Sequence, residues 1–195
     1  MKILIIEPEF EGHHISLYLR LILKKLLKNN IEFKILTTKK TIKSKPYKLL
    51  DKELSVKKKT FVSKESLEIK KKTLLNLLLF QIRYFLFIKK NLKLFRKNFK
   101  YDQVYFGHLD PFFFIFSIFL KFLNQGNLSG LLCNIRFYQS TYKIKKFRIL
   151  DFIKFILFKI SLKSKDLKKI FIVDELFYRF LKNRLTKSQL KKILF

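Results

Sequence analysis

Apolar positions along the chain follow two spacings, which predict strands separated by helices. Residues 3–6 form a short continuous apolar run, typical of a strand covered on both faces. From Ile15 to Leu27 apolar residues recur near helical spacing with basic residues between them, and residues 31–38 alternate as a second strand. The opening therefore predicts a strand, a glycine-containing turn, a helix and a strand. Because this unit starts at the first residue, we expect no signal peptide before it.

The remainder of the chain continues this order. Residues 39–72 are Lys-rich and predicted to be the least structured part, with one weak strand near residues 60–62. Further predicted elements are a long helix over 67–98, a strand over 101–106, a Phe-rich helix from Pro111 to Asn124, a strand over 130–136, a basic amphipathic helix over 144–162, a final strand over 169–173 and a last full helix over 174–183. This alternation predicts an α/β fold: one doubly wound, mostly parallel Rossmann-like sheet flanked by helices, with no linker dividing residues 1–195.

Ligands of such sheets bind at the carboxyl ends of the strands, which directs attention to three turns. The candidate residues are Gly12, His13 and His14 in the first turn, Gly107, His108 and Asp110 in the second, and Asp174 and Glu175 in the third.

Each turn has a functional and a structural interpretation. Gly12 lets backbone approach a ligand, and a neighbouring histidine can donate a hydrogen bond or act as a base near neutral pH. The alternative is that Gly12 only permits the turn while a histidine caps or packs. Asp110 either binds a hydroxyl or caps the helix that begins at Pro111, and Asp174 and Glu175 either bind substrate or cap the last helix.

Several common site types are absent from the sequence. No GxGxxG fingerprint occurs, so we expect no nicotinamide or flavin cofactor. Adjacent histidines chelate poorly and no carboxylate stands at a characteristic spacing, so we expect no metal site from His13, His14 and His108. The single Cys133 cannot form an internal disulfide, which fits a reducing cytosol.

The chain carries a net charge of +30, from 44 basic and 14 acidic residues. Such a charge favours an anionic surface as partner. Lys outnumbers Arg and is mixed with Phe and Leu, which fits a membrane surface better than nucleic acid, and no nucleic-acid-binding motif occurs. An AT-rich coding bias is the alternative origin of the charge. The apolar runs at 74–88 and 111–120 are too short to span a bilayer.

Three segments together resemble a known family. They are residues 1–38 with the Ile-Glu-Pro strand end and the Phe-Glu-Gly-His-His turn, residues 102–110 ending in Gly-His-Leu-Asp, and residues 170–175. This pattern resembles the N-terminal domain of GT-B fold glycosyltransferases of the family 4 type, many of which make bacterial surface polysaccharides. The resemblance implies that Gly12, His13, His14 and His108 line a substrate cleft, with Asp174 and Glu175 near its edge.

The resemblance also implies partners. Family members continue into a second Rossmann-like domain that holds most of the nucleotide-sugar donor site, whereas this sequence ends at Phe195. We therefore expect an acceptor-side domain without its donor domain, nearly inactive alone, and either truncated or completed by a second subunit. Its expected ligands are a nucleotide sugar and a lipid-linked or glycan acceptor, with no nucleic acid. Its expected location is the cytoplasm, peripheral at the inner membrane face. The alternative is a non-enzymatic, basic membrane-surface adaptor on the same scaffold.

Overall fold

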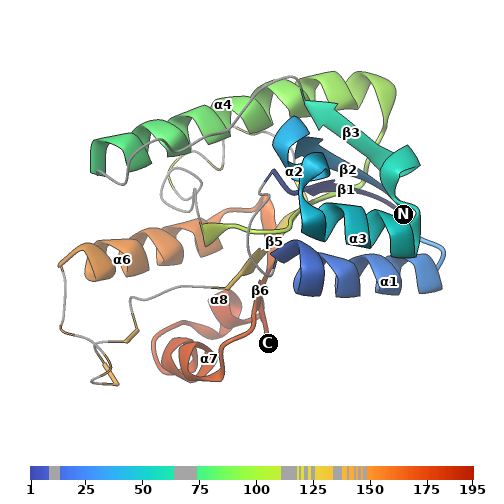
Figure 1. The fold of residues 1–195 in the computed structure, drawn as a ribbon. Coiled ribbons are helices and arrows are strands. Elements are labelled where there is room, and N and C mark those ends of the chain that lie inside the picture. The colour runs from blue at the N-terminus through green and yellow to red at the C-terminus, as the bar shows by residue number, and fades with distance from the viewer. Residues whose placement is uncertain are drawn as a thin grey trace. The chain divides into compact units, whose positions relative to one another are not determined.

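The protein divides into two compact units, Met1–His108 and Leu109–Phe195, in a computed structural model (Figure 1). The structure describes residues 1–8, 14–63, 74–110, 118, 120, 123, 126–133, 138–139, 141–142, 144, 146 and 149–195. Both units combine parallel strands with helices, which confirms the predicted α/β class and its Rossmann-like character.

The first unit contains four parallel strands in the order β3-β2-β1-β4. Its elements are β1 (Lys2–Ile6), the π-helical turn η1 (His14–Leu19), α1 (Arg20–Lys28), β2 (Glu32–Thr38), α2 (Lys39–Lys43), α3 (Lys45–Leu54), the 3-10 turn η2 (Lys57–Lys59), β3 (Thr60–Ser63), α4 (Leu74–Asn98) and β4 (Gln103–Phe106). Helices α1 and α3 lie on one face of these strands and α4 on the other (Figure 1). Strand β1 is central, and its Leu4, Ile5 and Ile6 are fully buried.

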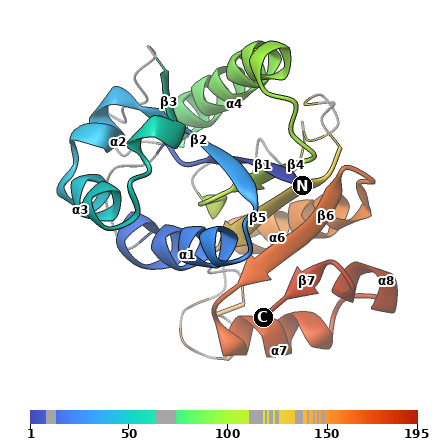
Figure 2. The ribbon, with the colours of Figure 1, turned by 90° about the vertical axis from the view of Figure 1, so that its right-hand side faces the viewer.

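The second unit contains three parallel strands in the order β5-β6-β7, with β7 beside β6 at the C-terminus (Figure 2). Its elements are β5 (Leu128–Leu132), α6 (Ile149–Lys163), β6 (Leu167–Ile172), α7 (Glu175–Lys182), α8 (Lys187–Leu190) and β7 (Ile193–Leu194). Helix α6 buries Phe158 and Leu162, and α7 buries Phe177, Phe180 and Leu181.

The strand, helix and second strand predicted for the opening are confirmed as β1, α1 and β2, and the π-helical turn η1 precedes α1. The glycine of the predicted turn lies outside the described residues. The helix ends at Asn29 and Asn30 as predicted, because Asn30 takes a left-handed conformation with φ of 52°. Residues 39–54 correct the prediction of an unstructured segment. Thr38 caps α2, Ser44 caps α3, and Pro46 stands in the first turn of α3, so two short helices form there.

Other predictions have mixed outcomes. The weak strand near residues 60–62 is β3, and the long helix is seen from Leu74 onward. The strand predicted over residues 169–173 is present as β6. The prediction that it is the final strand is wrong, because β7 follows it. The predicted Phe-rich helix lies largely outside the described residues. Among the helices of the described ranges, none combines the length and the apolar character needed to cross a bilayer.

Candidate functional site

The order of strands in the first unit creates a topological switch point between β1 and β4. From β1 the chain builds outward through β2 to β3, and α4 then returns it to the opposite side of β1 as β4. The strand order therefore reverses between the neighbouring strands β1 and β4. In parallel α/β sheets, ligands bind beside the carboxyl ends of the strands at such a reversal.

Glu7 and Gly107 meet at this switch point. Glu7 follows β1 directly, and its side chain is 1% exposed. A Cβ atom on Gly107 would lie 2.2 Å from the Oε2 atom of Glu7 and 3.1 Å from its Cδ atom. The absence of a side chain at position 107 is therefore what makes room for the Glu7 carboxyl group. His108 follows in sequence and is also buried.

Three threonines fix the backbone where the first turn begins. The Thr37 hydroxyl donates to the Glu7 carbonyl at 2.5 Å, and the Thr41 hydroxyl donates to the Pro8 carbonyl at 2.8 Å. The Thr38 hydroxyl also donates to the Pro8 carbonyl, at 3.3 Å. All three threonines are buried. The end of β2 and the start of α2 thus hold the entry of the turn that carries Gly12 and the two histidines.

The turn itself is only partly described. Gly12 and His13 lie outside the described residues, and His14 begins η1 with a side chain that is not described. Their proposed contacts with a ligand stay predictions. The structure does place Gly107 against Glu7 and buries the following His108, two residues predicted from the sequence to lie at this end of the sheet.

Asp110 belongs to the second unit and is engaged with the end of β5. Its carboxylate accepts the backbone N–H of Cys133 at 2.9 Å, and the N–H of Leu109 donates to the Leu131 carbonyl at 2.9 Å. Asp110 therefore anchors the backbone that follows β5. The cap predicted for a helix beginning at Pro111 lies outside the described residues.

Asp174 has a structural role. Its Oδ1 atom accepts the N–H of Phe177 at 2.9 Å, which caps α7, and its Oδ2 atom accepts the hydroxyl of Tyr138. Burial, and then this hydrogen bond to Asp174, raise the pKa of Tyr138 to about 12. Glu175 is exposed and pairs with Arg179 at 2.6 Å. Of the two interpretations of this turn, the structure supports capping for Asp174.

A second group of polar side chains joins α1 to α3. The Arg20 guanidinium donates to both carboxylate oxygens of Glu53, at 2.6 and 2.8 Å, and the Lys24 Nζ atom lies 2.6 Å from Glu53. The hydrogen bonds from Arg20 and Lys24 lower the pKa of Glu53 to about 2. A carboxyl group with this pKa is ionised at neutral pH, so it serves as a fixed anionic partner rather than as a proton donor.

Sequence reasoning missed Glu7 as a site residue. The available signal was an acidic residue directly after a continuous apolar strand, where burial of the carboxylate requires a compensating environment. A comparison with models of protein families and with curated proteins finds no match to this chain. The functional argument therefore rests on the fold and on the chemistry of its residues.

Proposed function

We propose that this chain is the acceptor-side domain of a GT-B type glycosyltransferase that transfers a sugar from a nucleotide-sugar donor to a lipid-linked acceptor in surface polysaccharide synthesis. The observation that carries the proposal is the buried polar group at the β1–β4 switch point. It combines Glu7, Gly107 and His108 with a turn entry held by Thr37 and Thr41. Polar groups gathered at a switch point are what a saccharide-binding crevice requires.

The proposed chemistry uses the histidines of the two turns. An acceptor hydroxyl oxygen attacks the anomeric carbon of the donor sugar, the bond from that carbon to the diphosphate oxygen breaks, and the nucleoside diphosphate leaves. The proton of the acceptor hydroxyl passes to a histidine, for which His13, His14 and His108 are the candidates. An imidazole is the side chain best suited to accept a proton near neutral pH. Gly12 and Gly107 would allow the acceptor to approach the backbone.

The proposal includes partners and a location. A donor-binding domain, on the same polypeptide or another one, would supply the nucleotide-sugar site. A lipid-linked acceptor places the reaction at the inner face of the membrane, where the excess of basic residues would favour anionic lipid. The competing proposal is a non-enzymatic membrane-surface adaptor, which is favoured by a basic and apolar helix face described below.

The deciding experiment is a titration of the ¹⁵N-labelled chain, followed by amide NMR signals. The probes are nanodiscs carrying polyprenyl-diphosphate-linked N-acetylglucosamine or hexose, with nanodiscs carrying polyprenyl phosphate alone as the control. We expect the signals of Glu7, Gly107 and His108 to shift only with the saccharide-bearing discs. Binding to all discs without shifts at these residues would support the adaptor and overturn the transferase proposal.

A second experiment tests the histidines in the assembly with its donor domain. Substituting His13→Ala, His14→Ala or His108→Gln should lower the rate of sugar transfer by a factor of about 100 or more for the residue that takes the proton. Folding is checked by circular dichroism, because His108 is buried. Unchanged rates in all three folded variants would assign the histidines to structure.

A further inference from the structure

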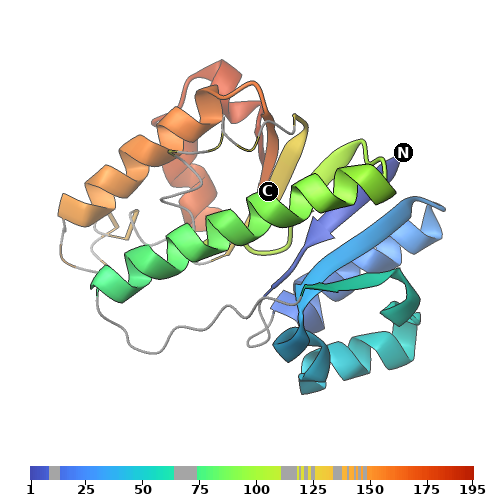
Figure 3. The ribbon, with the colours of Figure 1, turned by 90° about the horizontal axis from the view of Figure 1, so that it is seen from above.

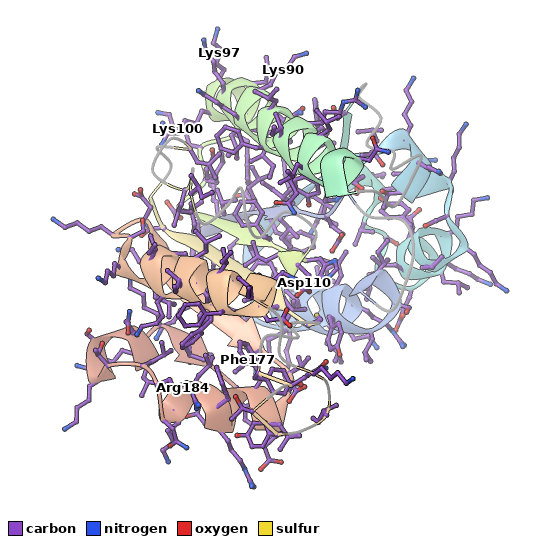
Figure 4. All side chains as sticks on the ribbon, turned by 90° about the vertical axis from the view of Figure 1, so that its left-hand side faces the viewer. Lys90, Lys97, Lys100, Asp110, Phe177 and Arg184 are labelled. Carbon is purple, nitrogen blue, oxygen red and sulfur yellow. The ribbon has the colours of Figure 1, made fainter. Side chains whose placement is uncertain are left out.

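Helix α4 carries positive charge without negative charge. Its 25 residues include no Asp or Glu. Its six basic residues are all exposed, and they are Arg83, Lys89, Lys90, Lys93, Arg96 and Lys97. Figure 4 shows Lys90 and Lys97 pointing outward from this helix.

The same side of α4 exposes large apolar side chains. These are Leu78, Leu79, Ile82, Leu86 and Leu94, each between 41% and 56% exposed. At about 100° per residue, the exposed apolar and basic positions together occupy one side of the helix. The opposite side is buried and includes Tyr84, Phe87 and Leu92. The exposed side is therefore apolar over its first three turns and mainly basic over the rest.

The apolar part of this face extends past the strands of its own unit. A helix of 25 residues is about 37 Å long, whereas a seven-residue strand such as β2 spans about 23 Å. Figure 3 shows the N-terminal end of α4 running beyond the strands of the first unit. Apolar side chains at a projecting helix end are accessible to a flat surface.

A basic pocket continues the face at the C-terminal end of α4. Leu94, Phe95 and Phe99 line a cavity of about 140 Å³ together with three lysines, Lys34, Lys58 and Lys59. The Lys34 ammonium lies 4.8 Å from the centre of the Phe99 ring, and the Lys59 ammonium lies 4.5 Å from that of Phe33. The Phe99 ring lines the pocket and holds the Lys34 ammonium beside it, which suits a phosphate group.

We infer that this α4 face, residues 78–97 with the adjoining lysine pocket, docks on an anionic lipid bilayer. Leu78, Leu79, Ile82 and Leu86 enter the boundary between headgroups and acyl chains, while the basic residues bind lipid phosphates. A nucleic acid would match the charge but leave the apolar half without a partner, so a bilayer fits both halves. The inference rests on the proposed location at a membrane and is independent of sugar transfer.

Sedimentation with vesicles tests the inference. The chain is mixed with vesicles of phosphatidylcholine, or of phosphatidylcholine and phosphatidylglycerol at 3:1. We expect binding to the anionic vesicles only, weakening as salt rises. The apolar variant Leu79→Ser, Ile82→Ser, Leu86→Ser should bind at least tenfold more weakly. The basic variant Lys89→Gln, Lys90→Gln, Lys93→Gln should bind about a hundredfold more weakly and depend less on salt.

Two matched variants serve as controls. Lys39→Gln, Lys43→Gln, Lys45→Gln removes three exposed charges from α2 and α3, and Ile149→Ser, Ile153→Ser, Ile156→Ser removes three exposed apolar residues from α6. Both should bind nearly as tightly as the unmodified chain. Loss of binding in either control with retention in both α4 variants would overturn the inference.

The remaining outcomes separate this inference from the proposed function. Absence of vesicle binding by the unmodified chain would overturn both the docking face and the membrane location, while the saccharide titration still judges the transferase proposal. Equal binding to neutral vesicles would overturn the role of the basic residues. Preferential binding to an RNA or DNA oligonucleotide at equal salt would overturn the bilayer as the partner.

Discussion

Glu7 and Gly107 are in contact, and the side chain of Glu7 occupies the space that a side chain at position 107 would need. A carboxyl group on a residue that is 1% exposed needs space and polar surroundings, and the missing side chain at position 107 supplies the space. The backbone of Gly107 is not in the left-handed region, so the contact with Glu7, and not the backbone conformation, favours glycine at this position. This packing links the ends of β1 and β4, where the ligand-binding crevice is proposed.

Substituting Gly107→Ala should destabilise the chain by about 1–3 kcal/mol, because the new Cβ atom overlaps the Glu7 carboxyl group. Urea unfolding measures this. The cost should persist in a Glu7→Gln background, where the side chain keeps its size, and should largely disappear in a Glu7→Ala background. An equal cost of Gly107→Ala in all three backgrounds would contradict the proposed contact.

Asp174 and Tyr138 provide a second pair, in which a residue with two interpretations, substrate binding or capping, caps a helix. Tyr138→Phe removes one hydrogen bond and keeps the α7 cap, so it should cost about 1 kcal/mol. Asp174→Ala removes both interactions and should cost about 2–3 kcal/mol. Equal losses of unfolding free energy in the two variants would contradict a separate capping contribution.

The raised pKa of Tyr138 gives this pair a pH dependence. With a pKa of about 12 in the folded chain against 10 for an ordinary tyrosine, its contribution is complete below pH 10 and is lost as pH rises toward 12. The stability difference between the unmodified chain and Tyr138→Phe should be constant from pH 8 to 9.5 and shrink above pH 10. Urea unfolding at these values checks the trend, and an unchanged difference at pH 11.5 would count against it.

At the scale of elements, one carboxylate joins two helices. Glu53 on α3 forms ion pairs with Arg20 and Lys24 on α1. These contacts lower the pKa of Glu53 to about 2, from 4.5 for an ordinary glutamate. A lowered carboxyl pKa stabilises the fold above pH 4.5, and this stabilisation is lost as pH falls toward 2.

Glu53→Gln should therefore lower the stability of the chain at pH 7, and the two proteins should converge as pH approaches 2. Thermal unfolding between pH 2 and pH 7 measures the convergence. Glu32→Gln, which removes the exposed ion pair with Lys2, is the matched control and should show a smaller effect because it loses a single partner. A constant difference between Glu53→Gln and the unmodified chain down to pH 2 would refute the proposed ion pairs.

The order of the elements was predictable from the sequence where a strand is buried on both faces or a helix is buried on one face. Strand β1 is continuously apolar and α1 is amphipathic, so periodicity alone located both. Helices α2 and α3 were missed because 6 of their 15 residues are lysines, although the caps at Thr38 and Ser44 and the Pro46 position were readable signals. Strand β7 has only two residues, and a segment of this length cannot show a periodic pattern of apolar residues.

The candidate site was only partly predictable for a different reason. The rule of carboxyl strand ends identified Gly107 and His108, since it needs only the position of a strand end. Glu7 required knowledge of the strand order, because only the pairing of β1 with β4 brings position 107 against it. The face of α4 likewise required the structure, since apolar residues lie on both the exposed and the buried side of the helix.

At the scale of the whole molecule, the net charge of +30 opposes folding in both units. The 44 basic residues outnumber the 14 acidic ones, so repulsion between like charges exceeds attraction within ion pairs such as that of Glu53. Salt weakens both the repulsions and the attractions. Because the repulsions are more numerous, the net effect of salt on the free energy of unfolding follows their weakening. The Debye length falls to about 10 Å at 0.1 M salt, which is enough to screen charges on neighbouring elements.

Raising sodium chloride from 20 mM to 300 mM should therefore increase the urea concentration at the midpoint of unfolding. Choline chloride and sodium fluoride at the same ionic strengths should give the same increase, because screening depends on ionic strength and not on the identity of the ion. In Lys89→Gln, Lys90→Gln, Lys93→Gln the increase should be smaller, since three exposed like charges of α4 are gone. A midpoint that falls with salt would mean that ion pairs, and not repulsion, dominate the electrostatics of this chain.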